Sequence, residues 1–192
     1  MKEQDSVADL SFESPITSSY STSSSNQTLT DISATTKVLV RASVDSAAAA
    51  TLGVSYGTLR REGDTIISGS RPDEWMILGN VDGVAAVVGG LDTSGHVSVV
   101  DFTHGRAMFR LAGPTSASVL EKVCGLDFAD NMTPNRAVVS ASVAKVGCDL
   151  ARDDQDGVLS YLILCDRSFG QYLLDAVLDA GNEYDLNPVA QM

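Results

Sequence analysis

One aspartate and one histidine stand close enough in the sequence to act together on a substrate. Asp101 precedes His104 by three residues, and both lie in a short polar stretch between two apolar runs. A carboxylate that orients an imidazole is a common arrangement for a general base. A turn histidine that bonds only to nearby backbone gives the same pattern, and no GxSxG nucleophile accompanies the pair. We therefore expect these residues to shape a turn and a docking element rather than a catalytic centre.

A run of acidic residues raises the question of cation binding. Asp153, Asp154 and Asp156 precede Gly157, in an order found in part of a calcium loop. The run lacks the spacing and the closing glutamate of such a loop, so we expect a solvated turn between strands. No GxGxxG follows a predicted strand and no GxxxxGK[ST] occurs, which argues against a nucleotide site.

The cysteines show no metal-binding pattern. They form no CxxC motif, and neither histidine is near them in sequence, so a zinc site is not expected. Each lies in an apolar run, where a free cysteine packs as a small hydrophobe. We expect buried, reduced thiols, with a redox or catalytic thiol as the alternative. The three are Cys124, Cys148 and Cys165.

Net charge limits the range of partners. The chain of 192 residues carries a formal net charge of −12, the wrong sign for neutralising the phosphates of a nucleic acid or an anionic membrane surface. No apolar run is long enough for a transmembrane helix. The first residues lack the apolar segment of a secretory signal and the arginines of a transit peptide. We expect a cytoplasmic protein.

The elements that would position these residues follow from hydrophobic periodicity. In the first half the pattern predicts, in order, a strand at 37–42, a helix at 44–52, strands at 65–68 and 74–78, and a helix at 81–90. Asp45 or Ser46 is the expected N-cap of the first helix, and Gly53 its end. The residues between the second and third strands are expected to form a turn built on Ser, Gly and Pro.

A hairpin is predicted next, from strands at 97–102 and 106–111, with Gly105 supplying a positive φ in the turn. Alternation along the second strand assigns one face to the core and leaves the other available to dock onto another chain. The expected core face holds Ala107, Phe109 and Leu111, and the expected docking face holds Arg106, Met108 and Arg110.

The remaining pattern gives a helix from Pro114, strands at 138–150 and 158–165 with a charged turn between them, and a last helix at 168–180. Ser168 and Gln171 form an expected capping box, and the apolar stripe of this helix includes Phe169 and Tyr172. The order predicts an α+β fold, with helices packed on a mostly antiparallel sheet in a doubled ferredoxin-like arrangement.

Composition divides the chain into three parts. Residues 1–36 are rich in Ser and Thr and are expected to be a flexible arm, or one that orders against a partner chain. Residues 37–186 form the expected single domain, and residues 187–192 the expected tail.

Three segments together resemble the gamma subunit family of heterotetrameric sarcosine oxidase. Residues 71–78 resemble its Pro-Asp-Glu-Trp-Leu strand entry, and residues 100–114 its Asp-x-Ser-His-Gly-Arg turn, strand and Gly-Pro helix start. Residues 166–173 resemble its Arg-Ser-Phe-x-x-Tyr opening of the last helix. The order and spacing of the three agree over residues 37–186, and the Ser/Thr-rich arm is not covered.

The resemblance implies a fold related to the folate-binding domain of the glycine-cleavage T-protein, an aminomethyltransferase. It implies a non-catalytic partner of alpha, beta and delta subunits in a complex that oxidises sarcosine to glycine, with hydrogen peroxide and formaldehyde or methylene-tetrahydrofolate as the other products. FAD, FMN, NAD, tetrahydrofolate and zinc are then expected on the other subunits, with none bound by this chain. The sequence leaves open whether sarcosine or another N-methyl amine is the substrate.

Departures from the aminomethyltransferase pattern favour the passive role. Their catalytic aspartate lies in a Gly-Gly-x-x-Asp-Asp strand, whereas the nearest stretch here lacks the double glycine and offers Asp149 alone, which we expect beside a turn at the surface. A stand-alone folate-binding aminomethyltransferase or demethylase and a free-standing scaffold remain alternatives. For the subunit hypothesis, the residues expected at a partner interface are Trp75, His104, Arg106 and Arg110.

Overall fold

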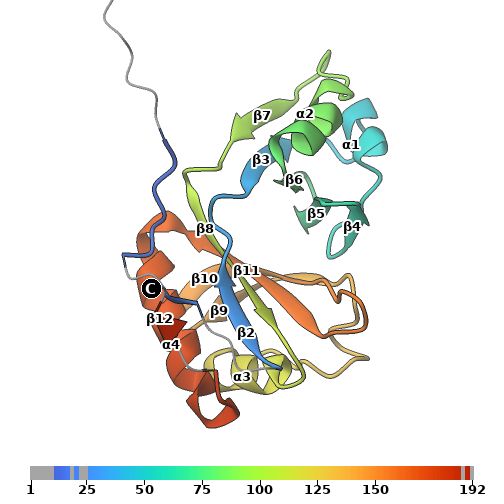
Figure 1. The fold of residues 1–192 in the computed structure, drawn as a ribbon. Coiled ribbons are helices and arrows are strands. Elements are labelled where there is room, and N and C mark those ends of the chain that lie inside the picture. The colour runs from blue at the N-terminus through green and yellow to red at the C-terminus, as the bar shows by residue number, and fades with distance from the viewer. Residues whose placement is uncertain (1–10, 18–19, 22–25, 187–188, 191–192) are drawn as a thin grey trace, which may run out of the picture.

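Two five-stranded sheets pack face to face, and each carries two α-helices on its outer side (Figure 1). The computed structural model describes residues 11–17, 20–21, 26–186 and 189–190. Strand order is β4-β5-β6-β3-β7 in the first sheet and β2-β8-β11-β10-β9 in the second, and neighbouring strands in both are antiparallel. The predicted α+β class and antiparallel pairing are confirmed.

The first sheet is covered by two short helices. Its elements are β3 (Thr36–Arg41), α1 (Ala47–Leu52), β4 (Leu59–Glu62), β5 (Thr65–Arg71), β6 (Glu74–Gly79), α2 (Val81–Gly89) and β7 (Ser98–Asp101). The Ser46 hydroxyl caps α1 by accepting from the Ala49 N–H, and Gly53 ends the helix at φ 60°, as predicted. Residues of α1 and α2 pack on Val40 and Ile77 of the sheet.

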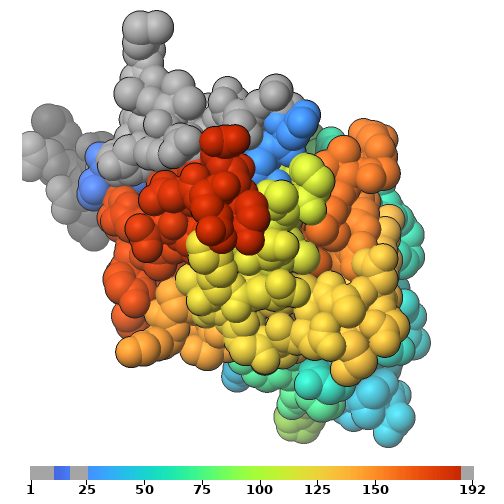
Figure 2. All heavy atoms as spheres, turned by 90° about the horizontal axis from the view of Figure 1, so that it is seen from below, coloured from blue at the N-terminus to red at the C-terminus, as the bar shows by residue number. Residues whose placement is uncertain are grey.

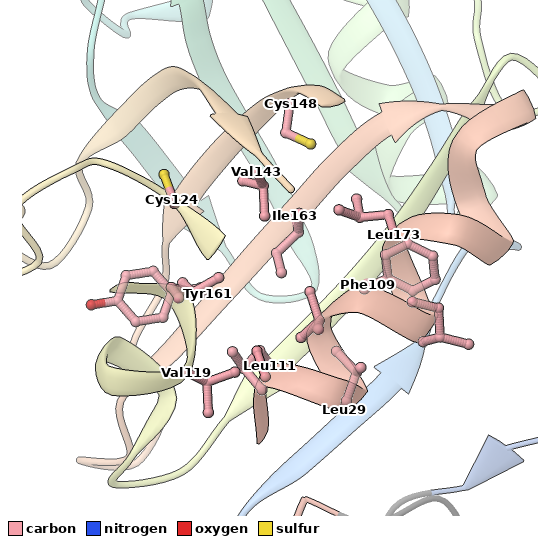
Figure 3. Close-up of a cluster of buried hydrophobic side chains, with 14 of the residues drawn as sticks. Leu29, Phe109, Leu111, Val119, Cys124, Val143, Cys148, Tyr161, Ile163 and Leu173 are labelled. Atoms are coloured by element: carbon pink, nitrogen blue, oxygen red, sulfur yellow. The ribbon is translucent and has the colours of Figure 1, made fainter. Parts of the chain in front are cut away.

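The second sheet carries the larger helical layer. Its elements are β2 (Thr28–Asp31), β8 (Arg106–Ala112), α3 (Ser116–Val123), β9 (Val138–Val143), β10 (Val146–Arg152), β11 (Ser160–Asp166), the 3₁₀ turns η1 (Arg167–Phe169) and η2 (Asn182–Tyr184), and α4 (Gly170–Gly181). Figure 3 shows the core under α3 and α4, where Phe109 and Leu111 of β8 lie beside Ile163 of β11. In Figure 2, α4 in red and the yellow segment that includes α3 lie side by side over this sheet.

A third apolar cluster lies between the two sheets. Leu39 and Met76 reach it from the first sheet, and Met108, Leu162 and Leu164 reach it from the second. Alternation along β8 therefore occurs as predicted, with Phe109 and its neighbours facing the helices. The other face was predicted wrongly, because Met108 is buried against the first sheet and is not free to meet another chain.

The predicted hairpin of residues 97–111 does not form. β7 pairs with β3 in the first sheet, whereas β8 pairs with β2 and β11 in the second. The intervening turn carries the chain from one sheet to the other, and Gly105 is not among the glycines of positive φ. Two strands around a polar turn give the same local pattern whether they pair together or separate, so pairing depended on contacts distant in sequence.

The predicted arm is partly integral to the domain. β2 is an edge strand of the second sheet, and Gln27, Leu29 and Ser33 are buried. At the other end, Leu186, the last residue of the expected domain, is buried, and within the expected tail β12 (Val189–Ala190) pairs with β1 (Tyr20–Ser21). The remaining positions of the predicted arm and tail, at 1–10, 18–19, 22–25, 187–188 and 191–192, lie outside the described residues.

Two strand predictions had the wrong boundaries. The expected strand at 138–150 is a hairpin of β9 and β10 that turns at Ala144 and Lys145, whose φ values of 47° and 68° occur without the usual Asn-Gly signal. β5 continues to Arg71, which leaves only Pro72 and Asp73 between β5 and β6.

Three helix starts also differ from the prediction. α1 begins at Ala47, α3 at Ser116 and α4 at Gly170, against predicted starts at 44, 114 and 168. The expected capping box is absent at α4, because Gln171 accepts hydrogen bonds from Thr17 and, among the described residues, no side chain caps that helix. Phe169 and Tyr172 are 47% and 53% exposed, so they lie outside the buried stripe of α4.

Candidate functional site

The turn after β7 uses its polar side chains to fix its own shape. The Asp101 carboxylate accepts a hydrogen bond from the Thr103 N–H at 2.8 Å, and hydrogen bonds from Thr103 lower the pKa of Asp101. The Thr103 hydroxyl accepts in turn from the Lys37 N–H at 3.0 Å. No hydrogen bond found among the described residues joins Asp101 to the His104 ring, so the two do not form the orientation pair of a general base.

His104 is exposed on one side and covered by the N-terminal segment on the other. Its ring centroid lies 5.3 Å from that of Phe12. The Arg167 guanidinium lies 5.5 Å from the Phe12 ring centroid and donates to the Glu13 carbonyl. Residues 11–17 thus lie against the start of α4, where the Thr17 N–H also donates to Gln171 at 2.9 Å.

A buried lysine lies under the same turn. The Lys37 ammonium donates to the carbonyls of Ser33 at 2.6 Å and Thr35 at 2.8 Å, and it approaches the Thr103 carbonyl at 3.5 Å. Burial lowers the pKa of Lys37 to about 8, although Asp31 and Asp101 act in the opposite direction. The sequence analysis treated Lys37 only as the start of a strand, and it therefore missed this link between the segments that enter β3 and leave β7.

Arg106 begins β8 and faces the space between the sheets. Its side chain is 17% exposed, pairs with Asp166 at 3.1 Å and lies 6.0 Å from the Phe102 ring centroid. Within the described part of the chain, its buried Nε atom has no hydrogen-bond partner. Arg106 lines a cavity of about 470 Å³ with Arg71 and Asp149.

Asp149 lies within β10, and not beside a turn at the surface as predicted. Its side chain is buried, and one carboxylate oxygen accepts from the Ser140 hydroxyl at 2.5 Å. The cross-strand register that places Ser140 opposite Asp149 explains this contact.

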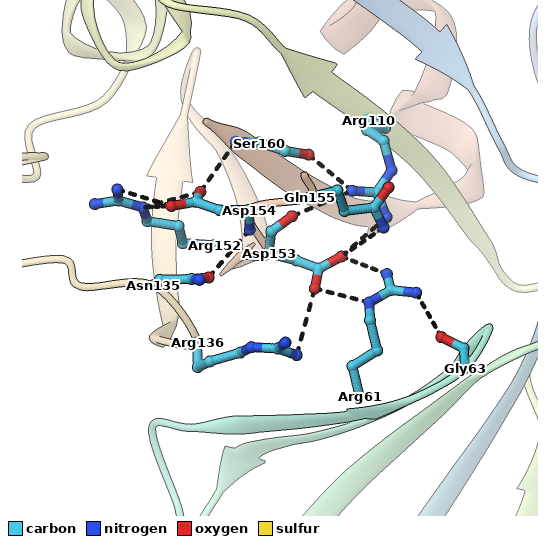
Figure 4. Close-up of polar contacts among 10 residues, drawn as sticks. All are labelled: Arg61, Gly63, Arg110, Asn135, Arg136, Arg152, Asp153, Asp154, Gln155 and Ser160. Atoms are coloured by element: carbon cyan, nitrogen blue, oxygen red, sulfur yellow. Dashed lines mark hydrogen bonds and ion pairs between the residues drawn. The ribbon is translucent and has the colours of Figure 1, made fainter. Parts of the chain in front are cut away.

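Arg110 takes part in an ion cluster at the opposite end of the sheet interface (Figure 4). Asp153 has no exposed side-chain surface and accepts from Arg61 Nε at 2.9 Å and Arg110 Nη2 at 3.2 Å, with Arg136 at 3.6 Å. Arg61 belongs to β4 and Arg110 to β8, so Asp153 joins the two sheets. Burial alone would raise the pKa of Asp153, but hydrogen bonds and charge from Arg61 and Arg110 outweigh it and hold that pKa below its usual range.

This cluster corrects one prediction and bears on another. Arg110 is used inside the domain, where it also donates to the Ser160 hydroxyl at 2.7 Å, and its place at a partner interface stays a prediction. The acidic run is not simply a solvated turn, because Asp153 is buried and Asp154 accepts from Arg152 at 3.0 Å. The sequence contains the arginines that pair with this acidic run, Arg61 of β4 and Arg110 of β8. Only the tertiary structure brings them beside Asp153.

Trp75 lies on the helix side of the first sheet and is only 2% exposed. Its indole Nε1 donates to the Val54 carbonyl at 2.8 Å. The indole contributes to the floor of a hollow of about 420 Å³ beside Val44 and Tyr56, which are exposed. Trp75 is therefore a core residue with little exposed surface, and its place at a partner interface stays a prediction.

The cysteines are buried in the core of the second sheet, as predicted. Burial raises the pKa of Cys148 to about 12 and that of Cys165 to about 11. Because the thiolate is the reactive form, these shifts disfavour a catalytic thiol. No group of three or more His, Cys, Asp or Glu side chains suited to a metal ion occurs in the part of the chain that the structure describes.

The exposed edge of the first sheet leads directly into the His104 turn. β7 ends the strand order, and all four of its residues are exposed, with Val99 at 37% and Val100 at 42%. Of the four residues predicted at a partner interface, His104 and Arg106 therefore share one region, and His104 is the exposed one. Trp75 and Arg110 lie elsewhere in the interior.

Most of the chain is similar in sequence to known proteins. The family model of the GCVT N-terminal domain matches residues 47–192. Sarcosine oxidase subunit gamma from Corynebacterium sp. (strain P-1) is 28% identical over 174 residues, which cover 84% of this chain and 83% of that protein. No helix among the described residues is long and apolar enough to cross a membrane.

Two solved structures show the same fold. A chain of the heterotetrameric sarcosine oxidase from Corynebacterium sp. U-96, in complex with pyrrole 2-carboxylate, superposes with a TM-score of 0.74 at 23% identity, over 88% of this chain and 91% of that one. The glycine cleavage system aminomethyltransferase T from Bartonella henselae gives 0.62 at 16% identity, over 80% of this chain and 45% of that one.

Proposed function

Because the chain belongs to the family of the GCVT N-terminal domain and is related to sarcosine oxidase subunit gamma, we propose that it is the gamma-type subunit of a heterotetrameric sarcosine oxidase-like flavoenzyme. Its partners are alpha-, beta- and delta-type subunits in the cytoplasm. Those subunits carry FAD, FMN, NAD, tetrahydrofolate and zinc. The complex demethylates sarcosine oxidatively to glycine, with hydrogen peroxide and formaldehyde or methylene-tetrahydrofolate as the other products.

The extent of the similarity carries this proposal. The match to the gamma subunit covers 84% of this chain and 83% of its relative, so the two are alike over most of their length. By contrast, the likeness to the aminomethyltransferase is one of fold, at 16% identity and over 45% of that chain. That difference favours a small partner subunit over a stand-alone aminomethyltransferase.

The geometry of the polar residues supports a non-catalytic role. Asp101 is bonded within its own turn instead of orienting His104. Asp149, the acid nearest to the aminomethyltransferase motif, accepts a hydrogen bond from Ser140 inside the sheet. This chain then contributes surface and stability to the complex, and the reacting groups belong to its partners.

The docking face in this proposal is the β7 edge together with the His104 turn. An edge strand has backbone groups free for pairing with another chain. Val99 and Val100 add exposed apolar surface on both sides of that edge, and His104 follows it directly.

Co-expression with the alpha-, beta- and delta-type chains tests the proposal. An affinity tag on this chain should recover all three partners. Val100→Lys should reduce their recovery at least about tenfold, because burying an unpaired ammonium at an interface costs more than the roughly 1.4 kcal/mol that equals a factor of ten.

Val81→Lys is the matched control, since Val81 is also exposed but begins α2 away from the edge. Equal recovery with both variants would refute the docking face. Failure of the unsubstituted chain to recover any partner would refute the subunit proposal, and retention of tetrahydrofolate by the isolated chain would instead favour the aminomethyltransferase alternative.

A further inference from the structure

The two ends of the sheet interface differ in how they are closed. Arg110 of β8 closes one end through Asp153. Arg106, at the start of the same strand, lines the cavity of about 470 Å³ at the other end. Between them Met108 fills the apolar centre. The charged residues that line this cavity are not members of the apolar cores and do not belong to the β7 edge.

Strand alternation shows that the cavity side chains share one face. Arg106 lies two residues before Met108, and Asp166 lies two residues after Leu164. Asp149 lies two residues before Ala151 on β10. Since Met108, Leu164 and Ala151 all belong to the cluster between the sheets, these polar side chains point into the same space. Arg71, at the end of β5, adds a guanidinium from the opposite sheet, where one of its nitrogen atoms also pairs with the buried Glu74.

Charges of both signs line the cavity, and one buried donor there has no partner among the described residues. Two arginines and two aspartates line it, together with the hydroxyl-bearing Ser140 and Ser142. The buried Nε of Arg106 has no hydrogen-bond partner within the described residues. Its ion partner Asp166 is 65% exposed, so water competes with Arg106 for that carboxylate. Arg106 is therefore available to a ligand carboxylate.

We propose that this cavity binds a small zwitterionic amino acid. Its carboxylate would lie on the side of Arg106 and Arg71, since guanidinium groups bind carboxylates with paired, charge-assisted hydrogen bonds. Its ammonium would lie on the side of Asp149, whose position is fixed by Ser140. The cavity volume falls within the range of small-molecule sites.

Charge balance distinguishes this ligand class from simpler ions. An anion would meet two carboxylates in the cavity and a chain of net charge −12. A cation would meet two guanidinium groups. A zwitterion can place its carboxylate against the guanidinium groups and its ammonium against the carboxylates. This inference goes beyond the proposed subunit role and does not depend on it, because binding would be a property of the isolated chain.

Isothermal titration of the full chain tests the site with glycine and N-methylglycine as probes. Acetate and methylamine, each carrying one of the two charges, are the half-ligand controls. We expect saturable binding of the zwitterions and at least about tenfold weaker binding of either half-ligand. Arg106→Gln and Arg71→Gln should each weaken zwitterion binding at least about tenfold, whereas Arg60→Gln, in an ion pair outside the cavity, should leave it unchanged.

Thermal unfolding of each variant shows whether it is folded, and Arg71→Gln, at a half-exposed position, keeps the test valid if Arg106→Gln does not fold. Absence of saturable binding of either zwitterion up to about 10 mM would overturn the proposal. Equal binding of acetate and glycine would also overturn it, because it would identify a simple anion site. Co-purification of the partner chains is unaffected by either outcome, so failure here is distinguishable from failure of the subunit proposal.

Discussion

Replacing Asp153 with asparagine tests whether the ion cluster holds the two sheets together. The substitution keeps the shape of the side chain but removes the charge that Arg61 and Arg110 share across the interface. Breaking a buried ion pair by removing one partner costs about 3–5 kcal/mol, because the remaining charge is left uncompensated. Since both arginines are partly exposed and retain some hydration, we expect the lower end, a loss of about 3 kcal/mol.

Chemical and thermal denaturation measure this loss. In a domain of this size, about 3 kcal/mol corresponds to a fall in Tm of roughly 6–12 °C. Asp156→Asn is the matched control, since Asp156 is exposed in the same acidic run at φ 51°, a conformation that asparagine tolerates. Its effect should stay within about 0.5 kcal/mol.

The pH dependence of Asp153→Asn gives a second check. The pKa of Asp153 is lower in the folded protein than in the unfolded chain, so its stabilisation is present above the unfolded pKa and is lost as pH falls through the folded one. The difference in stability between the unsubstituted protein and the variant should therefore shrink on acidification. If both substitutions have the same small effect at neutral pH, the cluster does not join the sheets energetically and our reasoning is refuted.

Two further predictions concern buried titratable groups. The pKa of Lys37 is lowered to about 8 from 10.5, so between these pH values the unfolded chain binds more protons than the folded one, and the Lys37 contribution to the free energy of unfolding rises with pH. Lys37→Met should remove that rise, as measured by urea unfolding at several pH values across this window. The same dependence of the free energy of unfolding on pH in both proteins would contradict the assignment. The thiols of Cys148 and Cys165, with pKa values raised to about 12 and about 11, should react with a disulfide reagent only after unfolding in guanidinium, and rapid labelling of the native chain would contradict their burial.

Local patterns predicted many of the elements but missed β2 and β4, and they did not predict the pairing of strands. The alternation of Ala107, Phe109 and Leu111 assigned the core face of β8, and residue types gave Gly53 as the end of α1 and Ser46 as one of its two expected caps. The separation of β7 from β8 was not predictable in this way, because the polar turn between them carries no signal for which sheet each strand joins.

The candidate site was predicted less well, for a related reason. The acidic run was expected to be solvated, yet Asp153 is buried with arginine partners far away in sequence. Lys37 was given no role beyond the start of a strand, yet its ammonium is buried on backbone carbonyls. The hydrogen bonds and ion pairs of these buried groups depend on tertiary contacts, which the pattern of a single sequence does not show. The exposed position of His104 is consistent with the expected turn. Arg110 was assigned to a docking face from strand alternation, and Trp75 to an interface from the subunit hypothesis, but both side chains are engaged inside the domain.

Native mass spectrometry of the co-expressed assembly tests the subunit proposal most directly. With the alpha-, beta- and delta-type chains present, the account predicts a four-chain complex that contains one copy of this protein and oxidises sarcosine. A three-chain oxidase of full activity, with this protein recovered separately as a monomer, would contradict it.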